Sequence, residues 1–156
     1  NREIKTRRTY KLNAKHYGVL EGKNKDEARY MYGDDQIAKW RRGLDERPPE
    51  IVITDPRFPG NDPKYSDILK FELPLAESEK DVYDRVIDYF EHEVSTFLKV
   101  GENVLIVSHG SPLRMLIKYL ENVPDNDTFE IEEGTVIVYD LTDELEITNK
   151  MIIDNL

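Results

Sequence analysis

The run from Val104 to Arg114, Val-Leu-Ile-Val-Ser-His-Gly-Ser-Pro-Leu-Arg, constrains the fold of this chain more than any other segment. Four consecutive apolar residues are typical of a strand that is buried on both faces, as in sheets covered by helices. The residues after the glycine predict a helix, because apolar side chains recur there at helical spacing, at Leu113, Leu116, Ile117 and Leu120. His109 therefore falls at the carboxyl end of a strand, where open α/β sheets bind their ligands.

This strand-to-helix turn has the composition of an anion site. We expect Ser111 to cap the helix and Pro112 to fit its first turn, so that the amino end of the helix points at His109. The free amides of Gly110 and Ser111, together with the helix macrodipole, would then attract phosphate or carboxylate. A structural histidine in an ordinary turn explains this motif equally well, and the motif alone leaves both readings open.

Composition narrows the class of protein. The 156 residues predict a single domain over 1–156. Disulfides and thiolate metal sites are excluded because the chain has no cysteine, and no apolar run is long enough to cross a membrane. The net charge is −10, with +5 in residues 1–47 and −15 in residues 48–156. An acidic chain is a poor match for a nucleic-acid backbone, but its basic first third is compatible with a pocket for a small anion. We expect a cytoplasmic protein.

The remaining pattern predicts alternating strands and helices. Helices are expected from Lys25 to Tyr32, from Gln36 to Arg42 and from Ser78 to Gly101, and strands over Thr6–Leu12 and Thr135–Leu141. Residues 145–153 are expected to form a last strand or a tail. Five prolines between residues 48 and 63 predict an irregular loop. The order predicts an α/β fold with a mixed sheet.

Further motifs stand in register with the His109 segment. They are the run from Leu12 to Lys25 (Leu-Asn-Ala-Lys-His-Tyr-Gly-Val-Leu-Glu-Gly-Lys-Asn-Lys), then Trp40-Arg41-Arg42-Gly43 and Glu72-Leu73-Pro74-Leu75-Ala76-Glu77-Ser78. In order and spacing these resemble the 2,3-bisphosphoglycerate-dependent phosphoglycerate mutases of the histidine phosphatase superfamily. The resemblance runs from about Lys5 to about Leu141. Each piece is a weak signal by itself, but four in register are a strong one.

The resemblance implies roles for named residues. His109 matches a histidine that holds and neutralises the phosphoryl group in flight, with Gly110 and Ser111 beside it. The residues expected to bind the phosphoglycerate are Lys15, His16, Tyr17, Lys25, Arg41 and Arg42, with His16 also supporting its loop. Paired arginines suit this because each guanidinium offers forked donors to carboxylate or phosphate. No metal is implied, because three dispersed histidines make no ligand set.

Two departures from the family bear on activity. The family carries its phosphoryl group on a histidine in an Arg-His-Gly segment, and none of His16, His92 and His109 lies between Arg and Gly. The family also has a glutamate, its general acid or base, where this chain has Ala14. A methyl group exchanges no proton, and losing a positioned acid or base costs about 10² to 10⁴ in rate.

The resemblance also implies a three-layer sheet with helices on both faces. In that fold the strand ending at His109 lies between the first two strands, and both would precede Asn1. We therefore expect an incomplete sheet, the carboxyl-terminal portion of the mutase-like domain. A bare apolar strand exposes backbone groups and apolar surface, so a cover or a rearrangement is needed.

Three functional readings follow. The first is a glycolytic phosphoglycerate mutase, interconverting 3- and 2-phosphoglycerate through a phosphohistidine not present in this chain, with 2,3-bisphosphoglycerate as primer. The second is a catalytically degenerate or truncated relative that binds an anion or forms an oligomer. A phosphatase of the same superfamily is the third, less favoured because Lys25 and the Arg41-Arg42 pair match phosphoglycerate binding. Each predicts a small anionic phosphorylated ligand and no nucleic-acid or membrane partner, and family analogy suggests a homo-oligomer.

Overall fold

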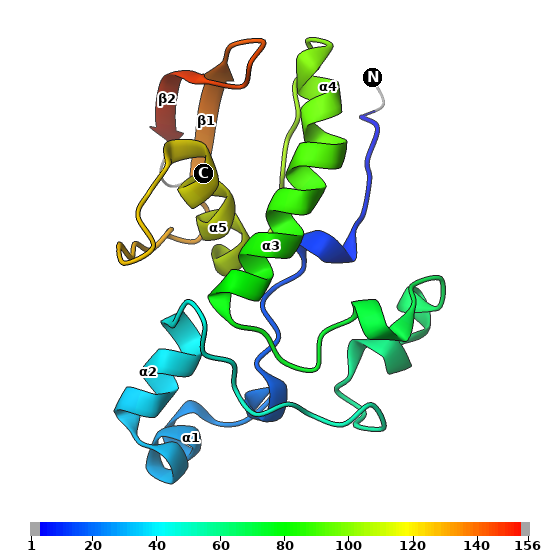
Figure 1. The fold of residues 1–156 in the computed structure, drawn as a ribbon, viewed down its shortest axis with the longest axis vertical. Coiled ribbons are helices and arrows are strands. Elements are labelled where there is room, and N and C mark those ends of the chain that lie inside the picture. The colour runs from blue at the N-terminus through cyan, green and yellow to red at the C-terminus, as the bar shows by residue number, and fades with distance from the viewer. Residues whose placement is uncertain (1–3, 154–156) are drawn as a thin grey trace. The chain divides into compact units, whose positions relative to one another are not determined.

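The computed structural model describes residues 4–153 and has the expected α/β composition, with helices and a small antiparallel sheet (Figure 1). The chain divides into two compact units. One consists of Lys15–Tyr83, and the other of the residues up to Ala14 together with those from Asp84 onward. Each unit is described separately below.

The Lys15–Tyr83 unit contains two short helices, α1 (Lys25–Tyr32) and α2 (Asp34–Arg42), which follow one another directly (Figure 1). The Asn24 side chain accepts hydrogen bonds from the amides of Asp26 and Glu27, which satisfies donors that the first turn leaves free. Gly33 separates the helices with φ +80°. The predicted helix from Lys25 to Tyr32 is thus confirmed, and α2 begins two residues before its predicted start.

The rest of this unit is irregular, as its prolines predict. Between α2 and the next helix the chain makes short 3₁₀ turns at Pro59–Asn61, Pro63–Tyr65 and Lys70–Glu72. Packing here depends on a few apolar side chains, of which Phe58 is 1% exposed. The other buried apolar residues of the unit include Ala28, Ile37, Pro48, Ile51, Leu73, Ala76 and Val82.

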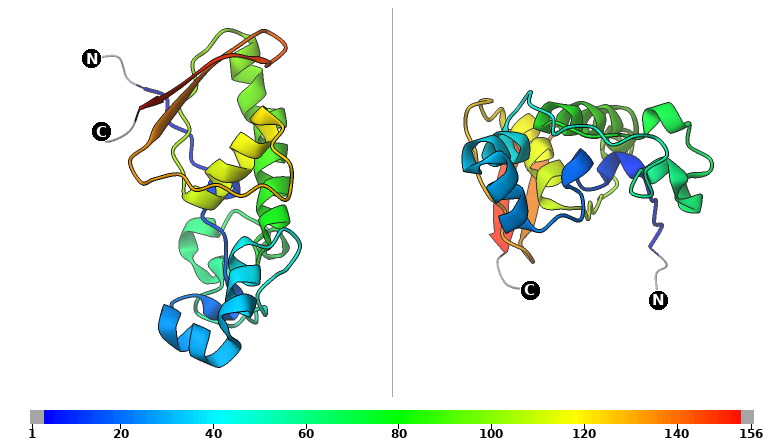
Figure 2. Two further views of the ribbon diagram at one scale, coloured as in Figure 1. Left: turned by 90° about the vertical axis from the view of Figure 1, so that its left-hand side faces the viewer. Right: turned by 90° about the horizontal axis from the view of Figure 1, so that it is seen from below.

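A long helical segment follows and continues into the other unit. It consists of α3 (Glu79–Tyr89), a π-helical segment (Phe90–Val94) and α4 (Ser95–Lys99), and the views of Figure 2 show it as one continuous helix. Ser78 caps it as predicted, because its hydroxyl accepts from the amide of Asp81 while the Asp81 carboxylate accepts from the amide of Ser78. Gly101, with φ +80°, follows its end.

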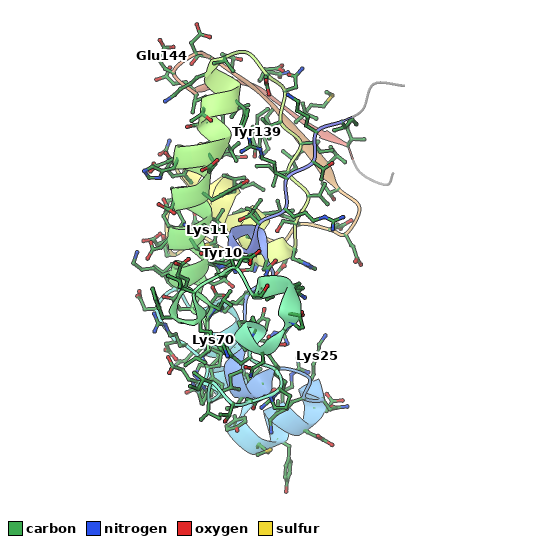
Figure 3. The ribbon with its side chains drawn as sticks, turned by 90° about the vertical axis from the view of Figure 1, so that its right-hand side faces the viewer. Tyr10, Lys11, Lys25, Lys70, Tyr139 and Glu144 are labelled. Atoms are coloured by element: carbon green, nitrogen blue, oxygen red, sulfur yellow. The ribbon has the colours of Figure 1, made fainter. Side chains whose placement is uncertain are left out.

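The unit that begins again at Asp84 adds α5 (Gly110–Glu121) and a hairpin of β1 (Val136–Leu141) and β2 (Ile147–Ile153). The strands pair antiparallel, with Val136 opposite Ile153, and a register shift lies between Asp140 and Leu141. Phe90 and Tyr119 meet edge to face at 5.9 Å, which packs the π-helical segment against α5. Figure 3 labels Tyr139 on β1 and Glu144 in the hairpin turn. Both predicted carboxyl-terminal strands are confirmed.

The predicted first strand is wrong. Residues 4–9 have no regular structure, and Tyr10–Leu12 form a single 3₁₀ turn. Side chains hold this turn instead of a strand ladder: the Arg85 guanidinium donates to the carbonyls of Lys11 (2.6 Å) and Asn13 (2.8 Å). The Ser108 hydroxyl donates to the carbonyl of Leu12 at 2.5 Å. Alternation alone does not make a strand, because a strand needs a partner for its backbone groups.

The expected buried strand before His109 is also wrong. Within residues 4–153, no backbone hydrogen bond is made by residues 103–107. Leu105 and Val107 are 80% and 82% exposed, whereas Ile106 between them is half-buried. The face of the apolar run that carries Leu105 and Val107 is therefore uncovered by the described part of the chain. Between residues 4 and 153 only β1 and β2 form a sheet, so the sheet is incomplete, as expected, and the three layers are not formed there.

Candidate functional site

His109 occupies the capping position of α5. Its φ and ψ are extended (−98°, 170°), and its carbonyl accepts the first helical bond, from Leu113 at 3.1 Å. The side chain makes no capping bond, is exposed, and has no hydrogen-bond or ion-pair partner among residues 4–153. The imidazole is therefore available to a ligand at this helix end.

Ser111 does not cap α5, which corrects the prediction. It lies inside the first turn and is buried, because the helix begins two residues earlier than Pro112 suggests. Proline is tolerated anywhere in a first turn, since the amides there have no intrahelical acceptor. Pro112 contributes no N–H, so the backbone donors of this helix end are the amides of Gly110 and Ser111.

The loop around His16 is fixed by hydrogen bonds at both ends of the residue. Its amide donates to the Glu77 carboxylate at 2.8 Å, and its carbonyl accepts from the Glu77 amide at 2.9 Å. The ring nitrogen Nδ1 accepts from the amide of Gly18 at 3.0 Å. The imidazole is 8% exposed, and Nε2 lies 3.4 Å from the carbonyl of Arg57. These contacts assign Nδ1 as the unprotonated nitrogen. The expected support of the loop by His16 is confirmed.

Two cationic side chains, those of Lys15 and Arg41, lie close to the ring of Tyr17. The guanidinium carbon of Arg41 lies 5.5 Å from the centre of the Tyr17 ring, and Nζ of Lys15 lies 5.4 Å from the same centre. Both distances are within the range of cation–π attraction. Arg41 is half-buried, and its guanidinium has no hydrogen bond or ion pair within residues 4–153, so its fork of donors is unused. Arg42 is exposed on the same turn, and its charge acts on Lys15.

Lys15 lies in the interior of this cluster. Its side chain is fully buried, and Nζ lies 3.4 Å from the Glu79 carboxylate, which is 5% exposed. Nζ also donates to the carbonyl of Trp40 at 3.0 Å and lies 3.5 Å from that of Arg41. Burial lowers the pKa of the Lys15 ammonium, and the neighbouring Glu79 carboxylate opposes that shift. Such a buried position does not fit a direct contact with a dissolved ligand.

The other two candidates differ in setting. Lys25 is the first residue of α1 and is exposed (Figure 3). Positive charge is unfavourable at a helix amino end, so helix stability does not account for a lysine there. Ala14 is exposed and precedes the Lys15 turn. Its methyl group has no proton to exchange.

The structure therefore brings together part of the predicted set. Within the Lys15–Tyr83 unit, Lys15, Tyr17, Arg41 and Arg42 form one group, which we call the Tyr17 cluster. His109, Gly110 and Ser111 form a second group at the start of α5 in the other unit. The first group offers cationic side chains and the second offers an imidazole and the amides of a helix start, and both kinds of donor suit anionic oxygens.

The sequence did not reveal the two buried carboxylates around the Tyr17 cluster, Glu79, which pairs with Lys15, and Glu77, which accepts from the His16 amide. Glu77 and Glu79 are 3% and 4% exposed, although acidic residues beside a helix start are typically surface charges that favour the helix dipole. Arg57 was also missed. Its guanidinium donates to the carbonyls of Val19 (3.2 Å) and Glu21 (2.9 Å) and pairs with Asp55. Arg57 was overlooked because the prolines around it predict an irregular loop, where an arginine is usually a solvated surface residue.

Other features of residues 4–153 add no chemistry to these groups. A cavity of about 940 Å³ in the unit that contains α5 is lined by Phe90, Tyr119 and Lys150 among others, and none of the candidate residues lines it. No set of three or more acidic or histidine side chains gathers there as a metal site. No helix in that part of the chain combines the length and apolar character needed to cross a membrane.

A comparison with protein families decides the relationship. The family description "Histidine phosphatase superfamily (branch 1)" matches residues 1–151, nearly the whole chain. The chain belongs to this superfamily. Histidine phosphatases include phosphatases and mutases, so membership points to phosphoryl-transfer chemistry. The match extends from the Tyr17 cluster through the His109 segment, and both groups of donors thus lie inside the family domain.

Proposed function

We propose that this histidine phosphatase is a bisphosphoglycerate-dependent phosphoglycerate mutase, interconverting 3- and 2-phosphoglycerate. The observation that carries the proposal is the Tyr17 cluster, where the unused guanidinium of Arg41 lies against the Tyr17 ring beside Arg42. Two guanidinium groups on one helical turn supply forked donors for a carboxylate or phosphate. Lys25, held at a helix end that disfavours its charge, is a further ligand.

The His109 group has a separate task in this proposal. The imidazole and the amides of Gly110 and Ser111 stabilise charge on the oxygens of the phosphoryl group during transfer. Phosphoryl transfer depends mainly on positioning and on such charge stabilisation, so these donors supply the larger part of the chemistry. The histidine that receives the phosphoryl group in the family lies in an Arg-His-Gly segment. None of the three histidines of this chain lies in such a segment.

The primer 2,3-bisphosphoglycerate carries two phosphates and one carboxylate, and the donors present fit such a polyanion. Arg41, Arg42 and Lys25 would hold its charged groups, and Tyr17 would orient it. When bound, it supplies the phosphoryl group that charges the enzyme. In the described residues we find no set of ligands for a metal, and the proposal needs none.

A second function rests on Ala14. Because a methyl group exchanges no proton, the same anion site without turnover describes a degenerate relative that binds a phosphorylated metabolite or self-associates. A cytoplasmic location and a homo-oligomeric state accompany both proposals. A phosphatase remains a third outcome, since the Tyr17 cluster would also bind other phosphate esters.

Calorimetry and a turnover assay separate these functions. We expect the chain to bind 3-phosphoglycerate, and Arg41→Gln or Arg42→Gln to weaken binding about tenfold or more, as losing a charge-assisted hydrogen bond does. Lys64→Met is the control, because Lys64 is exposed and pairs with Asp62. Absence of binding by the unaltered chain would overturn the anion site.

Mutase and phosphatase rates are then measured on the protein with and without Ala14→Glu. Isomerisation of 3-phosphoglycerate that rises by about 10² or more with Ala14→Glu supports a mutase. Binding without turnover in both forms identifies the degenerate relative, and release of inorganic phosphate as the main product identifies a phosphatase.

A further inference from the structure

The last turn of α2 contains Arg41 and Arg42, and its backbone carbonyls are hydrogen-bonded by a buried side chain. The final carbonyls of a helix have no intrahelical donor and need a partner. Here Nζ of Lys15 supplies it, donating to Trp40 at 3.0 Å with the Arg41 carbonyl at 3.5 Å. A cation at a helix carboxyl end also matches the macrodipole. One buried ammonium therefore fixes the backbone from which Arg41 and Arg42 project.

The same ammonium is tied to the start of α3. Its partner Glu79 is the first residue of that helix, and the Glu79 amide also donates to the carbonyl of Gly43 at 3.4 Å. Glu79 is therefore linked to the end of α2 in two ways. Its carboxylate pairs with Lys15, which bonds the last turn, and its amide donates to the carbonyl of Gly43. Both side chains of the ion pair are almost fully buried, so solvent does not screen it.

We propose that Lys15, held by Glu79, is a positioning residue of the anion site: it caps α2 and sets the Arg41 fork beside Tyr17 without touching the bound anion. This inference rests on the proposed function, because it assigns how the site of that function is held in place. It replaces the expected role of Lys15 as a ligand.

Variants at the ion pair separate positioning from simple stability. Lys15→Met leaves the buried Glu79 carboxylate without its cation, so it lowers the denaturation midpoint. Adding Glu79→Gln removes that second charge and restores stability, but it does not restore the cap on α2. The double variant should therefore be nearly as stable as the unaltered protein and still bind 3-phosphoglycerate about tenfold more weakly. Lys15→Arg, which keeps a donor, should recover part of the affinity.

Trp40 reports the geometry directly. It is the single tryptophan, lies in the turn that Lys15 caps, and contacts the Tyr32 ring edge to face at 5.1 Å. We expect the emission of Trp40 to change in Lys15→Met and in the double variant, but not in the Lys64→Met control. In the unaltered protein, the ¹³Cε signal of Lys15 should titrate below the usual lysine value of 10.5, and Trp40 emission should follow the same midpoint.

The outcomes decide the two proposals separately. A double variant with normal affinity and normal Trp40 emission overturns the positioning role, whatever the ligand proves to be. If the unaltered protein binds no 3-phosphoglycerate, the proposed function fails, while the Trp40 and Lys15 signals still test the cap. If Lys15→Met does not fold, Lys15→Arg and the titration of the unaltered protein decide. In that case, a Trp40 emission that does not change at the pH where Lys15 titrates would contradict the capping role of Lys15.

Discussion

Gly18 packs directly against the carbonyl oxygen of Pro49, where a β-carbon would overlap that oxygen. The same carbonyl accepts a hydrogen bond from the amide of Val19 at 2.9 Å, so it cannot move away without losing that bond. Gly18 also has φ +57°, a conformation that favours glycine. The close approach places the His16 loop against the segment after α2.

Gly18→Ala should therefore be strongly destabilising. We expect a loss of about 3 kcal/mol, from about 1 kcal/mol of backbone strain and about 2 kcal/mol of overlap with Pro49. Gly22→Ala is a matched control, because Gly22 has φ +70° but nothing within 4 Å of an added β-carbon. It should cost about 1 kcal/mol. Urea denaturation measures both, and equal losses would contradict the close approach.

Asp55 should titrate far below an ordinary aspartate. The hydrogen bonds from the side chain and backbone of Arg57 lower the pKa of Asp55 to about 2. A depressed folded pKa means that the pair stabilises the fold at pH values above the usual aspartate pKa, and that this contribution is lost as the pH falls towards 2. Carboxyl ¹³C NMR measures the midpoint. Arg57→Gln should return it towards 3.8, and an unchanged midpoint in that variant would refute the assignment.

Tyr139 should stay protonated in alkali. Burial and the hydrogen bond that its hydroxyl donates to Glu121 raise the pKa of Tyr139 above the ordinary 10. A raised folded pKa means that the bond stabilises the fold below pH 10 and is lost only as the pH rises beyond it. In an absorbance titration up to that pH, Tyr139→Phe should match the unaltered protein. A smaller absorbance change in Tyr139→Phe than in the unaltered protein would contradict the raised pKa.

The uncovered apolar run before His109 should drive association of this chain. The side chains of Leu105 and Val107 are more than three-quarters exposed, and the backbone groups beside them are unpaired within the described residues. This combination is typical of strand edges that aggregate with other chains. Leu105→Lys with Val107→Thr should raise the concentration at which light scattering detects aggregates. Phe71→Ser is the control, because Phe71 is 83% exposed but lies outside the run. Equal benefit from Phe71→Ser would argue against the run as the cause.

The sequence predicted the elements whose causes are local. The cap at Asn24, the glycine at position 33 and the Ser78–Asp81 capping pair fix helix ends through neighbours in the chain, and those helices are confirmed. Strands depend on partners elsewhere. Residues 6–12 and 104–107 have strand-like patterns without strand neighbours between residues 4 and 153, so their patterns were insufficient.

The candidate site divides in the same way. The resemblance to the mutases picked out Tyr17 and Arg41, which do lie together. It gave no sign that Lys15 would be buried, because its carboxylate partner Glu79 is 64 residues away and is brought to it only by folding. The Ser111 cap failed for a smaller reason: a first turn accepts Pro112 at more than one position, so the helix began earlier.

The π-helical segment keeps one stripe of the long helix in line. Val86, Phe90 and Val94 are all buried and are spaced four residues apart. In a regular α-helix each step of four residues overshoots a full turn by about 40°, so the stripe would drift sideways by about 80° from Val86 to Val94. The wider winding at Phe90–Val94 takes up part of that phase error. Because this segment holds one residue more than an α-helical turn would, deleting one residue there should restore regular α-helical winding and leave Phe97 on nearly the same side of the helix axis.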